Sequence, residues 1–252
     1  MNSASFRFYA GLNDFLAPRQ RGIRFSYSFW GSPAVKDAIE AIGVPHPEVE
    51  LLLVNAESAG FEILLHDGDM ISIFPRFQTL TVSDLSLVLP AQVENGRFVL
   101  DVHLGRLASF LRLLGFDVKY QNDASDADLA RYSSEEKRIL LTRDRGLLKR
   151  SEVDYGYCVR HTDPTAQTVE ILHHYNLWDN INPFSRCTRC NGGIFAIERE
   201  TVLDKILPGT RAAFAQFFQC DACGKIYWSG SHVEEMRIWV ENVLMNRPIR
   251  NF

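Results

Sequence analysis

The chain has 252 residues, of which 46% are hydrophobic and 23% are charged. This composition is that of a globular protein with enough material for a core, and the length predicts one to three domains. No apolar run approaches the roughly 18 to 20 residues that a membrane-spanning helix needs, and the N-terminal residues lack the basic and apolar segments of a secretion signal. We therefore predict a soluble, cytoplasmic protein with no membrane partner.

Charge is distributed unevenly along the chain. The net charge is −4, yet residues 97–150 carry 11 basic and 8 acidic side chains, a net of +3, and the segments on either side are acidic. A basic zone favours a polyanionic partner, although at this magnitude the preference is mild.

Residues 1–80 show the pattern of a small α+β domain. Alternating or continuous apolar residues predict five strands, at 6–9, 23–29, 50–55, 61–65 and 71–77. The stretch SPAVKDAIEAIGV predicts a helix over 32–44, with Ser32 as its N-cap and Gly43 as its stop. Two strands, a helix and further strands in about 80 residues are typical of a ubiquitin-like β-grasp domain.

The stretches VKDAIEAIGVPH and DGDMISIFP resemble the ThiS and MoaD sulfur carriers, which are ubiquitin-like proteins. Carriers of that family end in a free Gly-Gly whose carboxylate is activated, whereas here the last strand continues into Arg76, Phe77 and Gln78. We therefore expect no sulfur transfer by this route. The domain either docks a protein partner or stabilises its neighbour. Residues 81–96 follow as a predicted linker.

Strands alternate with helices over residues 97–180. Short apolar strands are predicted at 98–100, 116–120, 139–142 and 155–161, and helices are predicted after the first, second and fourth of them. The first helix has an apolar face of four leucines, Leu104, Leu107, Leu111 and Leu114, and Gly115 ends it. This alternation predicts an α/β domain with a doubly wound parallel sheet.

Acidic residues lie at one predicted edge of this sheet. Asp101 and Asp144 follow the carboxyl ends of strands, and Asp126 or Asp128 opens a helix from the same edge. Converging carboxylates would repel each other unless a divalent cation held them, and Mg²⁺ or Mn²⁺ prefers such oxygen ligands. A site of this kind can polarise a phosphate and generate hydroxide from water. Alternatively, Asp101, Asp126 and Asp128 could each cap a helix.

Arginines accompany these acids in the sequence. Arg143 and Arg145 flank Asp144, where they could hold phosphates as bidentate donors. Arg106 and Arg112, in the helix after the first strand, are further candidates for substrate binding. The alternative for each of them is a solvated surface charge.

Four of the five cysteines form two C-x-x-C pairs, in CTRCNGG and CDACGK. Without a secretion signal, such pairs favour metal binding over disulfides. They predict one structural zinc site in a ribbon that, with a C-terminal helix, occupies 181–252, and the ligands are Cys187, Cys190, Cys220 and Cys223. An inserted helix at 201–217 would account for the long spacer between the pairs. The aromatic residues of KIYWSGSH could stack on bases, or they could cover the thin core of the ribbon. Cys158 is expected to be a small core residue.

Three stretches together resemble the Mut-seven C-terminal RNase family, a branch of the PIN-domain nucleases: FVLDVHLGRLASFLRLLGFDV, SDADLARYSSEEKRILLTRDRGLL, and RCTRCNGG with FFQCDACGKIYWSGSH. The resemblance covers about residues 97–237, and several members also carry a β-grasp domain in front. It implies a PIN-like fold at 97–180, a zinc ribbon, and metal-binding aspartates at Asp101, Asp126 and Asp144.

This sequence departs from the family pattern at one position. Many PIN nucleases have a fourth acid shortly after the position of Asp144, where this chain has Arg145, Gly146 and Leu147. Asp163 and Asp128 are the candidates for an additional acid.

Two hypotheses follow from the sequence. The first is an endoribonuclease that hydrolyses RNA phosphodiesters with catalytic Mg²⁺ or Mn²⁺. The second is a catalytically silent RNA-binding or adaptor protein that uses its ribbon and β-grasp surfaces. We predict the first, and the missing fourth acid and the mild basicity keep the second open.

Overall fold

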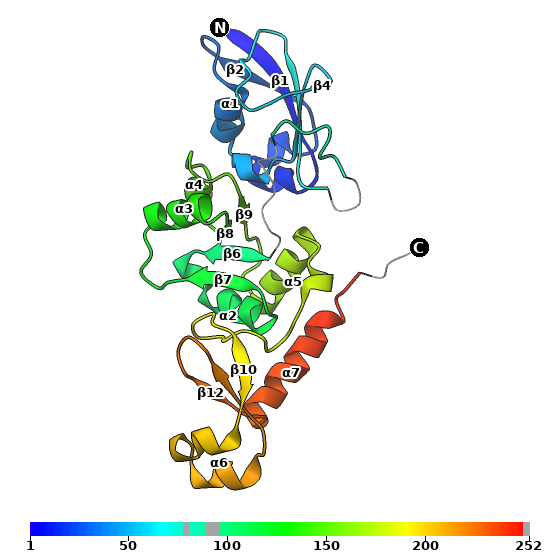
Figure 1. Ribbon diagram of the computed structural model, residues 1–252. Helices are drawn as coiled ribbons and strands as arrows, with labels where there is room; N and C mark the ends of the chain where they lie inside the picture. The colour runs from blue at the N-terminus through cyan, green and yellow to red at the C-terminus, as the bar shows by residue number, and fades with distance from the viewer. Residues whose placement is uncertain (78–80, 89–95, 249–252) are drawn as a thin grey trace. The chain divides into compact units, whose positions relative to one another are not determined.

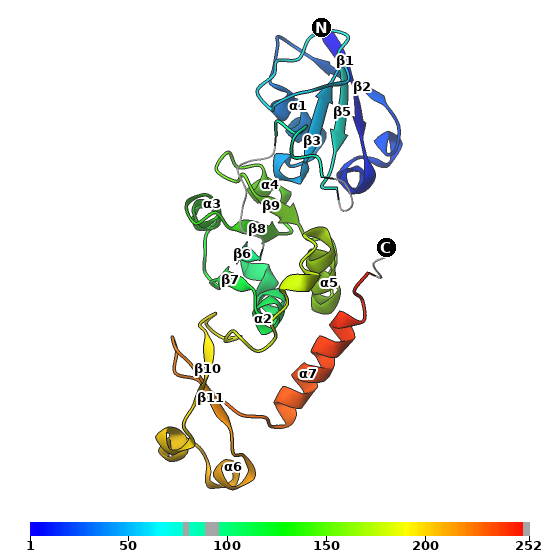
Figure 2. The same ribbon diagram turned by 45° about the vertical axis from the view of Figure 1, so that its right-hand side comes forward.

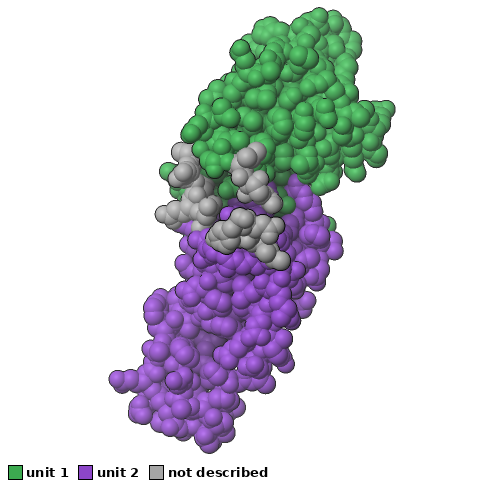
Figure 3. Space-filling model, turned by 90° about the vertical axis from the view of Figure 1, so that its right-hand side faces the viewer, with its two compact units in different colours: residues 1–94, 124–159 green, residues 95–123, 160–252 purple. Residues whose placement is uncertain are grey.

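The computed structural model describes residues 1–77, 81–88 and 96–248. The chain divides into two compact units, which Figure 3 distinguishes by colour. Unit 1 comprises Met1–Glu94 and Ala124–Val159, and unit 2 comprises Asn95–Asp123 and Arg160–Phe252. The predicted linker 81–96 includes residues 89–95, which lie outside the described residues. The predicted division between 97–180 and 181–252 stays a prediction.

Unit 1 contains the elements of the N-terminal domain and a second α/β segment (Figure 1). In chain order, with η for a 3₁₀ helix, they are β1 (Asn2–Phe8), η1 (Ala10–Phe15), η2 (Pro18–Gln20), β2 (Phe25–Phe29), α1 (Val35–Ile42), η3 (His46–Glu48), β3 (Leu51–Val54), β4 (Glu57–Ser58), β5 (Met70–Phe74), α3 (Asp126–Glu135), β8 (Ile139–Thr142), α4 (Arg145–Leu148) and β9 (Gly156–Cys158).

The N-terminal sheet is mixed, with the strand order β2-β1-β5-β3-β4. β1 pairs antiparallel with β2 and parallel with β5, so that Phe6 lies between Phe25 and Ile71. Figure 2 shows β1, β5 and β3 side by side. Phe6 and Phe8 are buried and Arg7 between them is exposed, which is the alternation that a sheet with one covered face requires. This sheet, together with α1, confirms the predicted β-grasp fold.

The predicted strand at 61–65 is wrong. The strand in this part of the sheet is β4, and Ile63 and Leu64 are 41% and 49% exposed. The carbonyls of Phe61 and Ile63 instead accept hydrogen bonds from the first turn of α1. An apolar run was therefore not enough to predict a strand, because its backbone is used by the neighbouring helix.

The same contacts correct the predicted N-cap at Ser32. Helix α1 has Ala34 at its N-cap, and no side chain caps it. The N–H groups of Val35 and Lys36 are bonded to carbonyls of the 61–65 segment, at 2.9 and 3.2 Å. A tertiary contact thus satisfies donors that a serine hydroxyl would otherwise bond. Gly43 ends the helix with φ 127°, as predicted.

The second segment of unit 1 is joined to the N-terminal domain by polar contacts. Glu48 is 5% exposed and accepts a hydrogen bond from the Cys158 N–H at 2.6 Å. The Lys149 ammonium donates to the Glu40 carbonyl at 2.5 Å. β8 and β9 pair in parallel, and all four residues of β8 are buried. The β-grasp domain is therefore packed on the elements that surround residue 144.

Unit 2 contains a parallel strand pair with its helices, followed by an antiparallel ribbon (Figure 1). In chain order its elements are β6 (Arg97–Leu100), η4 (Val102–Leu104), α2 (Gly105–Leu113), β7 (Asp117–Tyr120), α5 (Pro164–His174), η5 (Trp178–Asn180), β10 (Ile194–Ile197), η6 (Arg199–Lys205), α6 (Pro208–Ala213), β11 (Phe217–Cys220), β12 (Ile226–Tyr227) and α7 (Ser231–Leu244). Among the described residues, no helix combines the length and hydropathy that crossing a bilayer requires.

The parallel pairs β6–β7 and β8–β9, each followed or preceded by helices, confirm the predicted α/β class with a parallel sheet. Helix α2 ends where predicted, because Gly115 adopts φ +95°. A Cβ at Gly115 would lie 2.3 Å from the Asn182 carbonyl oxygen, so the chain that enters the ribbon passes directly over this glycine.

The ribbon is a three-stranded sheet in the order β10-β11-β12. The single inserted helix predicted at 201–217 is wrong, because two short helices, η6 and α6, occupy this region. Pro208 begins the second helix, and Phe217 already belongs to β11. Val202 and Ile206 of the insertion pack against Phe217 and give the ribbon a small core.

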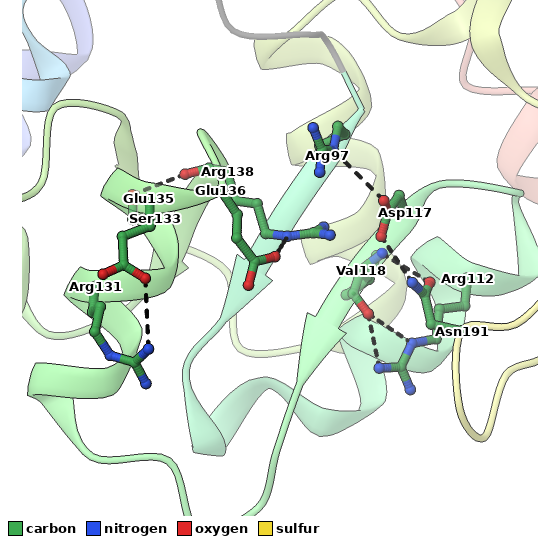
Figure 4. A network of polar contacts seen from close by, with 10 residues as sticks. All are labelled: Arg97, Arg112, Asp117, Val118, Arg131, Ser133, Glu135, Glu136, Arg138 and Asn191. Carbon is green, nitrogen blue, oxygen red and sulfur yellow. Dashed lines mark hydrogen bonds and ion pairs between the residues drawn. The ribbon is translucent and has the colours of Figure 1, made fainter.

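The Arg112 side chain connects α2, β7 and the ribbon, as Figure 4 shows for the contact with β7. It is 5% exposed. Nε and Nη2 donate to the Val118 carbonyl at 3.1 and 2.8 Å, and Nη1 donates to the carbonyls of Thr188 and Arg189 at 3.3 and 3.1 Å. Burial lowers the pKa of Arg112. This placement differs from the predicted role in substrate binding, because the guanidinium is buried on the protein's own backbone.

Replacing Arg112 with Met should destabilise the fold. The substitution keeps much of the apolar stem but removes the donor to the carbonyls of Val118, Thr188 and Arg189, and we expect a loss of about 2–3 kcal/mol in the free energy of unfolding. Urea denaturation followed by circular dichroism measures it. Arg106→Met is the matched control, since Arg106 lies on the same helix and is exposed. Equal stability of the two variants would contradict the role given to Arg112.

Candidate functional site

The two C-x-x-C pairs meet in unit 2. The sulfurs of Cys187, Cys190, Cys220 and Cys223 all lie within 4.8 Å of one another. Cys187 Sγ is 3.7 Å from Cys223 Sγ, and Cys190 Sγ is 3.4 Å from Cys220 Sγ. A tetrahedral zinc ion with zinc–sulfur distances of about 2.3 Å would separate its sulfurs by about 3.8 Å. The donor set and its spacing are therefore compatible with a zinc ribbon, as predicted.

The two cysteine turns have the same backbone construction. The Asn191 N–H donates to the Cys187 carbonyl at 2.9 Å, and the Gly224 N–H donates to the Cys220 carbonyl at 3.0 Å. Asn191 and Gly224 both have positive φ, 73° and 70°. Each turn thus needs a residue that tolerates the left-handed conformation directly after its second cysteine. This repetition turns both pairs toward one centre.

Cys187 is held by more than its own turn. The Tyr227 hydroxyl lies 3.0 Å from its sulfur. Burial raises the pKa of Cys187. Hydrogen bonds from Tyr227 and from the N–H groups of Cys190 and Arg189 lower it by more than burial raises it, so that the pKa is about 6. Donors of this kind stabilise a thiolate and fix its direction. Sequence reasoning missed this role for Tyr227, because nothing in the spacing of β12 distinguishes a donor to sulfur from a core aromatic.

Asn191 attaches the first turn to the α/β part of unit 2. Its amide oxygen accepts from the Val118 N–H at 2.9 Å, and its amide nitrogen donates to the Asp117 carboxylate at 2.8 Å (Figure 4). Asp117 in turn lies 3.6 Å from Arg97. The zinc ribbon is thus bonded to the edge of β7 by side chains that the metal-ligand pattern does not include.

Asp101 directly follows β6 and is 7% exposed. It occupies the N-cap position of η4, but its side chain makes no capping hydrogen bond there. The alternative that Asp101 serves as a helix cap is therefore wrong.

Asp126 and Asp128 have different surroundings in α3. Ser125 is the N-cap, and it forms a capping box with Asp128. Asp128 also pairs with Arg131 at 3.2 Å, and hydrogen bonds from Ser125 and Arg131 lower its pKa. Asp126 takes no part in the cap and is exposed. The capping alternative holds for Asp128 and not for Asp126.

Asp144 is exposed and is the N-cap of α4. Its Oδ1 accepts from the Gly146 and Leu147 N–H groups at 2.6 and 3.4 Å. Its own N–H donates to the Thr142 hydroxyl at 2.9 Å. The turn after β8 therefore fixes one carboxylate oxygen of Asp144, and with it the direction of the other.

The predicted substrate arginines differ in their freedom. Arg106 and Arg143 are exposed. The Arg145 guanidinium lies 4.9 Å from the centre of the Phe15 ring and donates to the Phe15 carbonyl at 3.4 Å, so the N-terminal domain holds it on one side. Asp163, a candidate additional acid, caps α5 and accepts from the Ala166 N–H at 2.9 Å.

Within the described part of the chain, the four cysteines are the one group of at least three His, Cys, Asp or Glu side chains whose ligand atoms lie within 4.8 Å of one another. Asp101 belongs to unit 2, and Asp126 and Asp144 belong to unit 1. The structure therefore brings the four cysteines together. The convergence of the aspartates on a cation stays a prediction.

A ubiquitin-like domain, an α/β segment with parallel strands and a four-cysteine ribbon together define the class of this protein. Residues 96–240 match the family described as the Mut7-C RNAse domain, and residues 1–81 match the one described as Mut7-C ubiquitin. The first match spans more than half of the chain, so this protein belongs to the Mut7-C RNAse domain family. The family supports a nuclease-type hydrolase, and the predicted resemblance is confirmed. No curated protein and no solved structure matches the chain.

The purified protein should contain about one zinc ion per chain, since four thiolates complete a closed tetrahedral site. Cys220→Ser should lose most of that zinc, because it removes one of the two buried ligands. Elemental analysis by mass spectrometry measures the content. Cys158→Ser is the control, and it should keep its zinc. A wild-type protein without zinc, or a Cys220 variant that retains it, would contradict the assignment.

Proposed function

We propose that this protein is a metal-dependent endoribonuclease that hydrolyses RNA phosphodiester bonds. Asp101, Asp126 and Asp144 would hold Mg²⁺ or Mn²⁺. The observation that carries the proposal is membership of the Mut7-C RNAse domain family over residues 96–240, a range that includes all three aspartates.

The local surroundings of the aspartates support this assignment. Carboxylate oxygens are the ligands that these hard cations prefer. Asp144 has one oxygen fixed by backbone N–H groups, which orients its second oxygen for a ligand. Asp101 is a buried acid directly after a strand and does not cap η4.

The bound cations would activate water and stabilise the leaving oxygen of the phosphodiester. Arg106 and Arg143 are exposed and would contact neighbouring phosphates. Arg145 would contribute the donors that Phe15 does not use. The zinc ion would be structural, because its four ligands all come from the protein.

A second candidate function is an RNA-binding or adaptor protein without catalytic activity, in which the β-grasp domain would contact a protein partner. One observation favours it. Arg145 stands just after Asp144, where many PIN nucleases have an acid, and the carboxylate of Asp163 is used as the cap of α5. A site with fewer acids would hold its cations more weakly.

Asp144→Asn should abolish metal-dependent cleavage without destabilising the fold. Asparagine caps a helix about as well as aspartate, so the hydrogen bonds to Gly146 and Leu147 can persist, while the charge that attracts the cation is lost. Labelled single-stranded and structured RNA, incubated with Mn²⁺ or with no added divalent cation, provides the assay. Thermal denaturation verifies the fold.

Asp37→Asn is the control for this experiment, since Asp37 is an exposed acid in the first turn of α1. It should cleave like the wild type. RNA binding without cleavage, unchanged by Asp144→Asn, would support the second candidate function and refute the first.

A further inference from the structure

A groove in unit 2 is not explained by the metal sites. Its volume is about 540 Å³, which is within the range of roughly 300–1,000 Å³ typical of ligand sites. The lining comes from three parts of the unit: the ribbon sheet, the first two turns of α7, and the segment 182–186 that leads from η5 into the ribbon. Figure 1 shows β10, β12 and α7, which contribute to it.

The floor of the groove is the second face of the ribbon. Ala196, Phe218 and Tyr227 are direct cross-strand neighbours, and all three line the groove. The neighbouring pair, Ile197 and Phe217, points to the opposite face, where Phe217 packs in the core of the insertion. Since side chains alternate between the faces of a sheet, the aromatic residues of this second face do not cover that core. The alternative of covering the thin core therefore holds for Trp228, which packs against it, and does not explain Tyr227.

Aromatic rings and arginines dominate the lining. The floor contributes the rings of Phe218 and Tyr227, and Phe184 adds a third ring. Among the described residues that line the groove, Arg186 and Arg237 are charged and none is acidic. Arg237 forms an exposed pair with Glu234 at 3.5 Å, a kind of interaction that a phosphate can replace at small cost. The groove therefore offers flat apolar faces and positive charge.

The segment 182–186, which forms one side of the groove, contains a residue in an energetically unfavourable backbone conformation. Phe184 has φ 63°, which a bulky side chain rarely adopts. The Phe184 N–H donates to the Leu113 carbonyl, and the Asn182 N–H donates to the Leu114 carbonyl, each at 2.9 Å. The end of α2 therefore fixes a strained residue beside the groove, and such strain concentrates at ligand sites. Arg186 is fixed as well, because it donates to the Gly115 and Asn191 carbonyls at 3.2 and 3.0 Å.

We infer that this groove binds unstacked bases of single-stranded RNA, with Phe218 of its floor as a stacking residue and Arg186 and Arg237 near the phosphates. The inference rests on the proposed function in naming RNA, and it adds that the substrate presents a single-stranded segment. Stacking on aromatic side chains with arginines beside them is the general mode of single-strand recognition. An apolar peptide could pack against the aromatic rings of the groove, but it would leave the charges of Arg186 and Arg237 without a partner.

Phe218→Ala should weaken the binding of single-stranded RNA by about 5- to 100-fold, the effect of losing one stacked base. Fluorescence anisotropy with labelled RNA measures it on the full-length, zinc-loaded protein. The Asp144→Asn substitution is present in all variants, so that no cleavage disturbs the measurement. Duplex RNA of the same sequence should bind more weakly than the single strand and lose much less affinity on Phe218→Ala.

Two further variants test the mechanism. Phe218→Tyr keeps an aromatic face and should keep binding, whereas Leu207→Ala, which removes an exposed apolar side chain of the insertion, should change nothing. Arg237→Gln should reduce the slope of log affinity against log salt concentration by about 0.7.

The outcomes separate the groove from the nuclease. If Phe218→Ala binds single strands as well as its parent does, or weakens duplex and single-strand binding equally, the inference is overturned even if the wild type cleaves RNA. If Phe218→Ala loses single-strand binding but the wild type never cleaves, the groove stands and the nuclease proposal fails. Competition by an apolar peptide that is unaffected by Arg237→Gln would assign the groove to a protein partner instead.

Discussion

The structure of unit 2 depends on two peptide groups of the first cysteine turn whose carbonyl and N–H are both hydrogen-bonded. The carbonyls of Thr188 and Arg189 accept from the buried Arg112 guanidinium. The N–H groups of the same two peptide units, those of Arg189 and Cys190, are directed at the Cys187 sulfur. In a trans peptide the carbonyl and the N–H point in opposite directions. Each of these two peptide units therefore has the Arg112 guanidinium at its carbonyl oxygen and the Cys187 sulfur at its N–H. Hydrogen bonds in such a chain strengthen each other. The zinc site and the α/β core are therefore coupled, and loss of the metal should weaken the hydrogen bonds of Arg112 to the first cysteine turn.

The β-grasp domain has a comparable role in unit 1, although its contacts are different. Its Phe15 holds Arg145, the residue after Asp144, and its Glu40 and Glu48 bond Lys149 and the N–H of Cys158. A ubiquitin-like domain whose last strand continues into the chain cannot act through a free C-terminus. These contacts favour the interpretation that it stabilises its neighbour, because they fix the turn that presents Asp144. They leave its outer surface open to a protein partner, which stays a prediction.

The sequence predicted those features that depend on local pattern. The alternation of β1, the stops at Gly43 and Gly115 and the cysteine turns are properties of short segments, and the structure has them. The errors arise where a tertiary contact replaces a local one. The 61–65 segment bonds α1 instead of a strand, and this removes the need for a cap at Ser32. An arginine such as Arg112 is a common phosphate ligand, so the sequence favoured a role in substrate binding. Its hydrogen bond to the Thr188 carbonyl, 76 residues away in the sequence, shows that it stabilises the fold instead.

Helix geometry explains why Asp128 caps α3 and Asp126 does not. The third residue of a helix can return its carboxylate to the N-cap, and Asp128 does so with Ser125 while also pairing with Arg131. The first residue cannot make this contact, so Asp126 keeps its carboxylate available at the same helix end. Three such acids repel each other without a cation. A divalent cation would be needed to hold three such carboxylates in one site.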